Sequence, residues 1–315
     1  MGLVKQLKPG ISVVIPAYNS ELTLEELVDR LDAVLKGYPA REAIIVDDGS
    51  RDGTWAVIER IAKKHRWVRG LTLMRNYGQH NALLCGIRLA RYDVTVTIDD
   101  DLQHPPEELP KLLAGLETAD VVYGRPETEQ HGVARDLASR LTKLSLRAAM
   151  GTKNATDVSA LRVFKTRVRE AFADYHGSYV SIDPMLAWGT HRFSAVTVRH
   201  QPRPRGRSNY TWRRLALHAL NLITTFSSWP LQIASLVGFG FTLFGLATLA
   251  YVLGRYVLSG TTVPGFPFLA SIIAIFSGAQ LFALGIIGEY LARVHSHSLA
   301  RPPFTVRESV GPDPD

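Results

Sequence analysis

The 315-residue sequence predicts an α/β domain built on a mostly parallel sheet, followed by an amphipathic helix and a hairpin of two membrane-spanning helices. Short apolar runs alternate with helically spaced segments before residue 125, which is typical of parallel sheets covered by helices. Residues 229–253 and 266–288 carry no charge, and each run exceeds the ~20 residues that cross a bilayer core. The 46% of hydrophobic residues excludes a disordered or fibrous chain.

The first strand is expected at residues 11–16, where a β-branched run without a polar face is typical of a strand buried on both sides. The helix that follows begins after Thr23, which forms a capping box with Glu26. Further strands are expected at residues 42–48, 71–74, 94–99 and 120–124. Helices are expected between them, at residues 54–65, at residues 79–90 and from Pro105 onward. Sheets of this kind bind ligands at the carboxyl ends of their strands.

The region after residue 125 is less regular. We expect a helix at 133–150, strands at 160–164 and 193–199, and a loop rich in Pro, Gly and Arg at 201–211. The segment that follows has one apolar and one polar face, which is typical of a helix lying in a membrane interface. The predicted units are an α/β domain at 1–210, an interfacial helix at 211–228, a membrane hairpin at 229–292 and a tail at 293–315. Within the hairpin, the two spans are expected at about 229–253 and 266–290. The last residues of the tail are expected to be frayed.

The net charge of +7 is concentrated beside the apolar runs. Six arginines and no acid lie between Arg199 and Arg214, whereas the turn between the runs carries only Arg255. By the positive-inside rule, both flanks of the hairpin face the cytoplasm. The N-terminus has no hydrophobic signal region, so we expect a multi-pass protein of the cytoplasmic membrane with its α/β domain and C-terminus in the cytoplasm. The basic excess indicates topology and attraction to anionic lipids rather than nucleic-acid binding.

Acidic residues follow two of the predicted strands. Asp99, Asp100 and Asp101 come at the end of the fourth strand, where an extended chain would point Asp99 and Asp101 to the same side. Oxygen ligands so arranged suit Mg²⁺ or Mn²⁺, particularly when a diphosphate completes the shell, and a solvated acidic loop is the alternative. Residues 47–50 either receive a base or ribose or form an ordinary turn. The single cysteine, Cys85, excludes an internal disulfide and a thiolate metal cluster.

Several motifs together resemble glycosyltransferase family 2. They are residues 14–19 (VIPAYN), 46–50 (VDDGS) and 99–107 (DDDLQHPPE). A further motif at residues 75–80 (RNYGQH) narrows the resemblance to the polyprenyl-phosphate glycosyltransferases, and residues 288–291 (GEYL) resemble the bacterial members with two spans. The resemblance covers nearly the whole chain. It implies a GT-A fold and transfer from a nucleotide-sugar to a lipid phosphate.

The same resemblance assigns roles to individual residues. The residues that it places on the nucleoside side of the donor pocket are Pro16, Tyr18, Asp48 and Asp99. At the metal, Mg²⁺ or Mn²⁺, it places Asp101 and Gln103. Asp100 stands where the family usually has a small residue, so its carboxylate either tightens metal binding or points into solvent. His80 and His104 are expected beside the site or at helix ends rather than as metal ligands.

Asp157 matches the catalytic aspartate of the family. Because the second pKa of a phosphomonoester is about 6, the attacking oxygen is largely ionised at pH 7. Asp157 therefore acts as a base, orients the acceptor or stabilises positive charge at the anomeric carbon. The residues expected at the acceptor phosphate are Arg125, Arg162, Arg203, Arg205 and Ser208. Residues 203–210 match a family loop beside the membrane, with Asn209 in place of the usual lysine, and guanidinium groups bind phosphate bidentately.

The resemblance thus implies an inverting, metal-dependent transferase that moves a sugar from a UDP- or GDP-linked donor to a polyprenyl phosphate, with undecaprenyl phosphate expected, for cell-envelope glycan or lipid modification. Two alternatives stay open: a non-catalytic membrane scaffold partnering a flippase, and a processive polysaccharide synthase, whose Gln-x-x-Arg-Trp motif the sequence lacks. The sugar is open too, because residues 75–80 favour an arabinose-type donor and the spacing of residues 157–162 favours a glucosyl type. Small residues in the spans permit close helix packing, so a homo-oligomer is expected.

Overall fold

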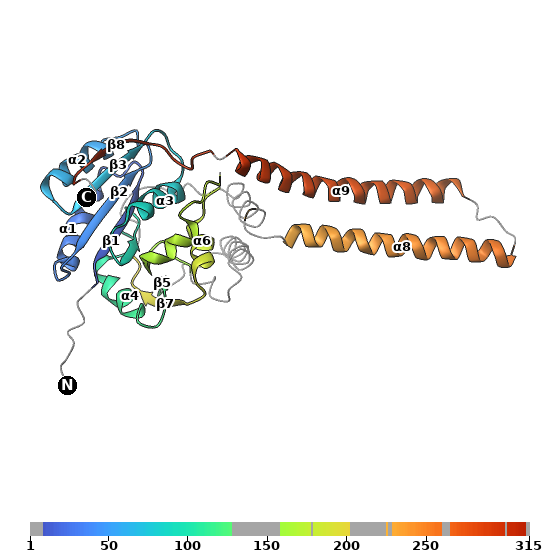
Figure 1. Cartoon of the computed structure of the whole chain (residues 1–315), viewed down its shortest axis with the longest axis horizontal. Helices are drawn as coiled ribbons and strands as arrows, with labels where there is room; N and C mark the ends of the chain where they lie inside the picture. The colour runs from blue at the N-terminus through green and yellow to red at the C-terminus, as the bar shows by residue number, and fades with distance from the viewer. Residues whose placement is uncertain are drawn as a thin grey trace.

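The computed structural model of the chain describes residues 9–127, 158–177, 179–201, 225, 229–259, 265–299 and 301–312. An α/β domain lies at one end, and two long helices extend from it side by side (Figure 1). The predicted helix at 133–150, nearly all of the loop at 201–211 and nearly all of the interfacial helix at 211–228 lie outside the described residues.

The described strands form one mixed sheet in the order β7-β5-β6-β4-β1-β2-β3-β8. The strands are β1 (Ile11–Ala17), β2 (Arg41–Asp47), β3 (Val68–Leu73), β4 (Val94–Thr97), β5 (Val121–Pro126), β6 (Arg162–Lys165), β7 (Phe193–Val198) and β8 (Val306–Val310). The pairs β1–β2, β1–β4, β2–β3 and β5–β7 are parallel. β6 runs antiparallel to β4 and β5, and β8 runs antiparallel to β3. The predicted mostly parallel sheet is therefore confirmed.

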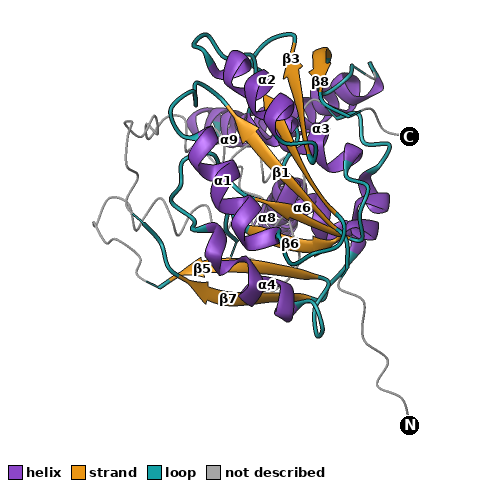
Figure 2. Cartoon of the chain, turned by 90° about the vertical axis from the view of Figure 1, so that its left-hand side faces the viewer, coloured by secondary structure: helices purple, strands orange, loops and turns teal. Residues whose placement is uncertain are grey.

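Helices cover both faces of this sheet (Figure 2). They are α1 (Leu24–Leu35), α2 (Thr54–Lys64), α3 (Gln79–Leu89), α4 (Leu109–Gly115) and α6 (Ile182–Gly189), with the 3-10 helices η1 (Pro106–Glu108) and η3 (Thr166–Phe172). Successive residues of β1 pack on opposite faces of the sheet. Val13 belongs to the core under α1, α2 and α4, and Val14 belongs to the core under α3 and α6. Gly86 lets α3 approach closely, because a Cβ there would collide with Val14.

The start of α1 differs from the prediction. Thr23 is the N-cap residue, but its side chain makes no capping hydrogen bond. Its backbone is helical (φ −118°, ψ −26°), whereas a capping side chain normally requires an extended backbone at this position. The Thr23 hydroxyl donates instead to the Ser20 carbonyl at 3.4 Å. The predicted capping box with Glu26 is therefore wrong, although the helix begins where the sequence indicated.

The two apolar helices are α8 (Trp229–Ser259) and α9 (Phe266–Ser298), and both run beyond the predicted spans. Their apolar stretches, Pro230–Leu258 and Ile275–Ser296, have mean hydropathies of 2.0 and 1.4 and are exposed. The helices contact each other through Phe276 of α9, whose ring lies 5.7 Å from that of Phe241 of α8. Each helix is long and apolar enough to cross a membrane, as the sequence predicts.

The segment after α9 returns to the α/β domain. Residues Val306–Val310 form β8, which pairs with β3 at the edge of the sheet. Just before this strand, the N–H of Met74 donates to the carbonyl of Thr305 at 2.9 Å. The prediction of a frayed tail is wrong for residues 306–310. Their side chains are mostly exposed, so backbone pairing rather than a hydrophobic pattern places this strand.

Candidate active site

The candidate site lies at the carboxyl ends of β1, β2 and β4, which are neighbours in the sheet. Pro16 and Ala17 of β1 pair with Val46 and Asp47 of β2, so these two strand ends lie side by side. Proline has no N–H to donate within a sheet. The pairing of β1 with β4 ends at Val14, before Pro16, so the missing N–H of Pro16 interrupts no hydrogen bond between these two strands. The sheet thus brings together the segments that the sequence predicts to bind the donor.

Asp48, directly after β2, holds the loop that precedes α3. Its two carboxylate oxygens accept the N–H groups of Tyr77 at 2.7 Å and Gly78 at 2.8 Å. Gly78 has a φ of +98°, which favours glycine. Asp48 is 3% exposed, and burial raises the pKa of its carboxyl while the two N–H donors oppose that shift. Asp48 therefore shapes this loop, and its contact with a nucleoside stays a prediction.

The three consecutive aspartates lie on a turn rather than on an extended strand end. β4 ends at Thr97, Asp100 and Asp101 lie in a turn, and Leu102, which follows them, has a φ of +59°. The predicted strand at 94–99 is two residues too long, and the common side expected for Asp99 and Asp101 stays a prediction. The three carboxylates have three different sets of partners.

Asp99 and Asp101 each accept a hydrogen bond from a glutamine residue. Asp99 accepts a 2.7 Å hydrogen bond from the Gln79 side chain, and Asp101 accepts the N–H of Gln103 at 3.1 Å. Burial, and next the charges of Asp101 and Asp100, raise the pKa of Asp99 to about 7, and Arg162 opposes the shift. Sequence reasoning quoted Gln79 only as part of a family motif and missed its contact with Asp99. The crowded negative charge would be relieved by a bound cation.

The residues present fit a divalent cation. Asp101 offers a carboxylate and Gln103 an amide oxygen, both hard ligands of the kind that Mg²⁺ and Mn²⁺ prefer. The amide nitrogen of Gln103 lies 3.5 Å from the His200 ring nitrogen. The described residues contain no group of three His, Cys, Asp or Glu side chains placed to hold a metal. A cation here would therefore take further ligands from a diphosphate and water.

The two histidines of the predicted motifs serve the surrounding structure. The His104 Nε2 lies 3.0 Å from the Ser159 hydroxyl, and its ring packs edge-on against His200. Burial lowers the pKa of His104 to about 4, so the imidazole is neutral at pH 7. The Nδ1 of His80 accepts the N–H of Ile182, at the start of α6. Both contacts agree with the prediction that these side chains lie beside the site.

Asp100 makes contacts with the loop after β1 that the sequence did not predict. Its Oδ2 accepts the N–H of Tyr18 at 3.3 Å and a short hydrogen bond from the Ser20 hydroxyl. Burial raises the pKa of Asp100, and these donors oppose the shift. The carboxylate thus turns toward the loop after β1. Tyr18 itself is 43% exposed, with its side chain open to a ligand.

Arg162 lies inside the domain. Its side chain is 4% exposed, and its Nε and Nη2 donate to the carbonyl of Ser159 at 3.1 and 3.0 Å. The Nε also lies 3.5 Å from Asp183, which accepts a 3.0 Å hydrogen bond from Tyr123. The sequence predicted Arg162 at an acceptor phosphate, but this burial directs its charge to Asp183 and Asp99 instead. Asp183 and Tyr123 are the partners that sequence reasoning missed, since neither lies in a quoted motif.

The remaining acceptor residues are only partly described. Arg125 is exposed near the end of β5. The other residues predicted for the acceptor and the reaction, Asp157, Arg203, Arg205 and Ser208, lie outside the described residues. Their roles stay predictions.

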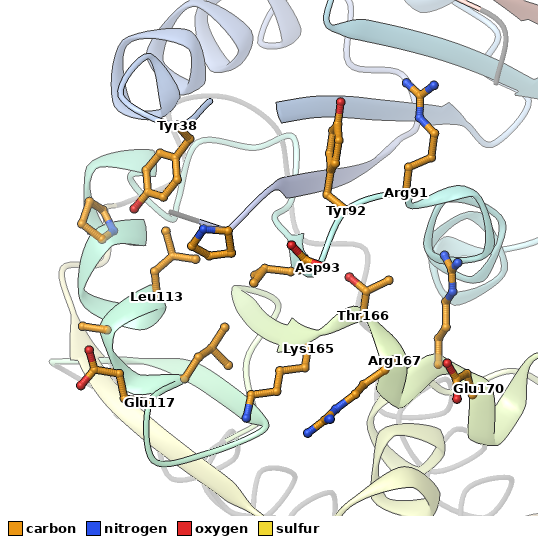
Figure 3. Close-up of a pocket in the computed structure, with 16 residues that line it drawn as sticks. Tyr38, Arg91, Tyr92, Asp93, Leu113, Glu117, Lys165, Thr166, Arg167 and Glu170 are labelled. Atoms are coloured by element: carbon orange, nitrogen blue, oxygen red, sulfur yellow. The ribbon is translucent and has the colours of Figure 1, made fainter. Parts of the chain in front are cut away.

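A cavity of about 820 Å³ opens at the other end of the sheet (Figure 3). Its lining includes Pro9, which precedes β1, and Val94, the first residue of β4, so it lies opposite the acidic turn. Two of the cations that line it are already paired, Lys165 with Asp120 at 2.7 Å and Arg91 with Glu42 at 3.0 Å. We assign this cavity no part in the candidate site, because the acidic and loop contacts described above lie elsewhere.

Comparison with known families agrees with this geometry. The family model described as "Glycosyl transferase family 2" matches residues 12–175, which include β1, the acidic turn and β6. Undecaprenyl-phosphate 4-deoxy-4-formamido-L-arabinose transferase of Shewanella sediminis is 36% identical over 307 residues, covering 95% of this chain and 92% of the relative. The protein of the same name from Yersinia pestis is 33% identical, covering 96% of this chain and 94% of the relative.

Solved structures support the fold. Glucosyl-3-phosphoglycerate synthase of Mycobacterium tuberculosis, in complex with Mn²⁺, UDP and phosphoglyceric acid, superposes with a TM-score of 0.51 at 20% identity, covering 69% of this chain and 77% of that chain. The same enzyme with Mn²⁺, UDP-glucose and phosphoglyceric acid also gives a TM-score of 0.51, with 78% of that chain covered. The α/β domain therefore has the architecture of these nucleotide-sugar enzymes.

Proposed function

Because this chain belongs to glycosyltransferase family 2, we propose that it transfers a sugar from a nucleotide-sugar to undecaprenyl phosphate at a membrane. The observation that carries the proposal is the match over 95% of the chain to relatives named for undecaprenyl-phosphate sugar transfer, with both apolar helices included. The first donor to test is the UDP-linked 4-deoxy-4-formamido-L-arabinose that the names of the relatives suggest, with UDP supported by the neighbours of the same fold.

The donor would bind at the ends of β1, β2 and β4. In this proposal Pro16, Tyr18, Asp48 and Asp99 line the nucleoside side, and Asp101 and Gln103 hold Mg²⁺ or Mn²⁺. The cation, when bound, neutralises the diphosphate leaving group. The placement of Asp99, Asp100 and Asp101 in one short segment after β4 supports this assignment, because a divalent cation is attracted to such a concentration of carboxylates.

The lipid phosphate would attack in line. One of its oxygens bonds to the anomeric carbon on the face opposite the diphosphate, the bond from that carbon to the diphosphate oxygen breaks, and the nucleoside diphosphate leaves with the electron pair. The configuration at the anomeric carbon inverts. Since the phosphate is largely ionised at pH 7, Asp157 is proposed to orient it or to stabilise the developing positive charge, with proton abstraction as the lesser need.

Arginines near the membrane are proposed to bind the acceptor. Arg203, Arg205 and Ser208 belong to a basic segment just before α8, where a lipid phosphate would lie, and exposed Arg125 is a further candidate. Arg162 is not kept as a direct phosphate ligand, because it is 4% exposed and paired with Asp183. We further propose a cytoplasmic orientation of the domain from the positive-inside pattern, and a homo-oligomer from the small residues in α8 and α9.

The test uses the full chain in detergent micelles with undecaprenyl phosphate and a panel of UDP- and GDP-linked sugars, in the presence of Mg²⁺ or Mn²⁺. Release of the nucleoside diphosphate and the mass of the lipid product are measured together. Lipid-dependent release with one donor is expected. No release with any donor would favour the non-catalytic scaffold, and a polymeric product would favour a processive synthase. Arg203→Ala should raise the KM for undecaprenyl phosphate more than the KM for the donor.

A further inference from the structure

The loop after β1 contains Asn19, whose backbone is left-handed, and hydrogen bonds with the segment after β2 hold it in place. Asn19 has a φ of +55°, its N–H donates to the Ser50 hydroxyl at 2.9 Å, and its side-chain oxygen accepts the N–H of Arg51 at 2.9 Å. The N–H of Ser20 donates to the Thr54 hydroxyl at 2.7 Å. These hydrogen bonds join the loop to the segment after β2, and Glu21 adds two more, with Asp52 and Gly53. They fix it on one side only.

The carboxylate of Asp100 fixes the loop on the other side, from the end of β4. Its Oδ2 accepts both the N–H of Tyr18 and the hydroxyl of Ser20, so one oxygen binds the residues on either side of Asn19. The loop is therefore held between two strand ends, and the exposed Tyr18 side chain starts from a fixed backbone.

We propose that Asp100 is a positioning residue of the donor site, which holds Tyr18 in place for the nucleotide instead of binding the metal. This inference rests on the proposed function, because it takes the ends of β1 and β4 as the place where the nucleoside diphosphate binds.

The geometry explains why a third acid is tolerated beside Asp99 and Asp101. Three neighbouring carboxylates aimed at one cation site would repel one another whenever that site is empty. The oxygen of Asp100 that accepts two donors faces the loop, so part of its charge is compensated there. Asp100 acts through Tyr18 and Ser20, and a loss of its carboxylate is expected to change nucleotide affinity before it changes metal affinity.

The test measures binding of UDP, and in parallel of GDP, to the full chain in detergent at saturating Mn²⁺ by calorimetry. Binding of Mn²⁺ is measured separately at saturating nucleotide. Asp100→Ala is expected to weaken nucleotide binding about five- to tenfold and to leave the Mn²⁺ affinity within about twofold. Asp100→Asn keeps one acceptor oxygen and should recover part of the loss. Asp29→Ala, which removes a carboxylate that is 57% exposed on α1, is the matched control and should bind as the wild type does.

Ser20→Ala provides a second route that keeps Asp100 in place. It should weaken nucleotide binding about two- to threefold, and the double variant should lose less than the product of the two single losses, because the hydrogen bond from Ser20 to Asp100 is already lost in either single variant. In steady-state assays Asp100→Ala should raise the KM for the donor with kcat nearly unchanged. If Asp100→Ala fails to fold, the Ser20→Ala binding loss alone decides the matter.

Several results would overturn the inference. A roughly tenfold loss of Mn²⁺ affinity in Asp100→Ala, with nucleotide binding affected only through the metal, would make Asp100 a metal ligand. Wild-type nucleotide affinity in both Asp100→Ala and Ser20→Ala would show that the contact positions nothing. If the wild type binds UDP or GDP but transfers no sugar, the proposed function fails while the inference stands. If it binds neither nucleotide, the inference falls with the donor site.

Discussion

The guanidinium carbon of Arg88, on α3, lies 5.8 Å from the centre of the Phe304 ring, which follows α9. Phe304 is partly buried and packs against the hydrophobic core that includes Leu73 and Cys85. The chain that leaves the second apolar helix is therefore anchored to the α/β domain before it forms β8. This contact joins the chain after the apolar hairpin to α3, a helix that covers the sheet.

Replacing Phe304 with Ala should destabilise the domain. The ring is partly buried, and we expect a loss of about 1–2 kcal/mol, less than the cost for a fully buried phenylalanine. The melting temperature of the detergent-solubilised protein, followed by circular dichroism, should fall by several degrees. Arg307→Ala, at an exposed position of β8, is the control and should melt with the wild type. Equal melting of the Phe304 variant and the control would mean that the anchor contributes nothing.

The strands and helices of the first half could be predicted because their buried apolar residues recur along the sequence with the period of a strand or of a helix. Val13 and Val14 serve opposite faces of the sheet, and the pattern of residues 11–16 reflects that directly. β8 could not be found in this way, since its side chains are mostly exposed and its partner β3 lies more than 200 residues earlier in the chain. The edge strand depends on backbone pairing, which leaves no hydrophobic signal.

The candidate site was also predictable only in part. Asp48, Asp99 and Asp101 were expected together because strands of one sheet end at one edge, and the structure places them there. The direction of each carboxylate was not predictable, because it depends on the left-handed backbone at Leu102 and on partners from distant segments. Burial of Arg162 was missed for the same reason: its partner Asp183 belongs to a helix with no motif.

Removal of the metal ligands should abolish transfer without unfolding the protein. Asp101→Asn keeps the size of the side chain but removes its charge, so we expect sugar transfer to fall roughly 100-fold or more while the melting temperature changes little. EDTA should inhibit the wild type, and added Mn²⁺ or Mg²⁺ should restore its activity. Asp29→Asn is the matched control for loss of an exposed carboxylate. Full activity of Asp101→Asn, or activity that persists in EDTA, would contradict the metal assignment.

Asp120 should contribute stability that depends on pH. A 2.7 Å bond from Lys165 holds its pKa below the ordinary value of 3.8, and burial opposes the shift. The contribution is therefore present above pH 3.8 and is lost as the pH falls through the lower folded-state pKa. Asp120→Asn should lower the stability by about 2 kcal/mol at pH 7, and the two proteins should converge on acidification. Melting curves from pH 7 to pH 3 check this, and a constant difference over that range would contradict it.

Cys85 should resist alkylation in the folded protein. The side chain is 1% exposed, and burial raises the pKa of its thiol to about 12. At pH 8 only roughly one molecule in ten thousand carries the reactive thiolate. Iodoacetamide should therefore label the protein only after unfolding in dodecyl sulfate, and a mass shift reports the reaction without ambiguity because Cys85 is the single cysteine. Rapid labelling of the native protein would show that α3 opens or packs differently.

The position of β8 imposes an order on synthesis. Every other described strand leaves the ribosome before α8 and α9, whereas β8 is translated after both of them. Until then the edge of β3 exposes unpaired main-chain groups, which can template aggregation. A nascent chain interrupted inside the hairpin would carry that open edge, and a chain translated through residue 310 would close it. Completion of the sheet therefore reports that the whole hairpin has been made.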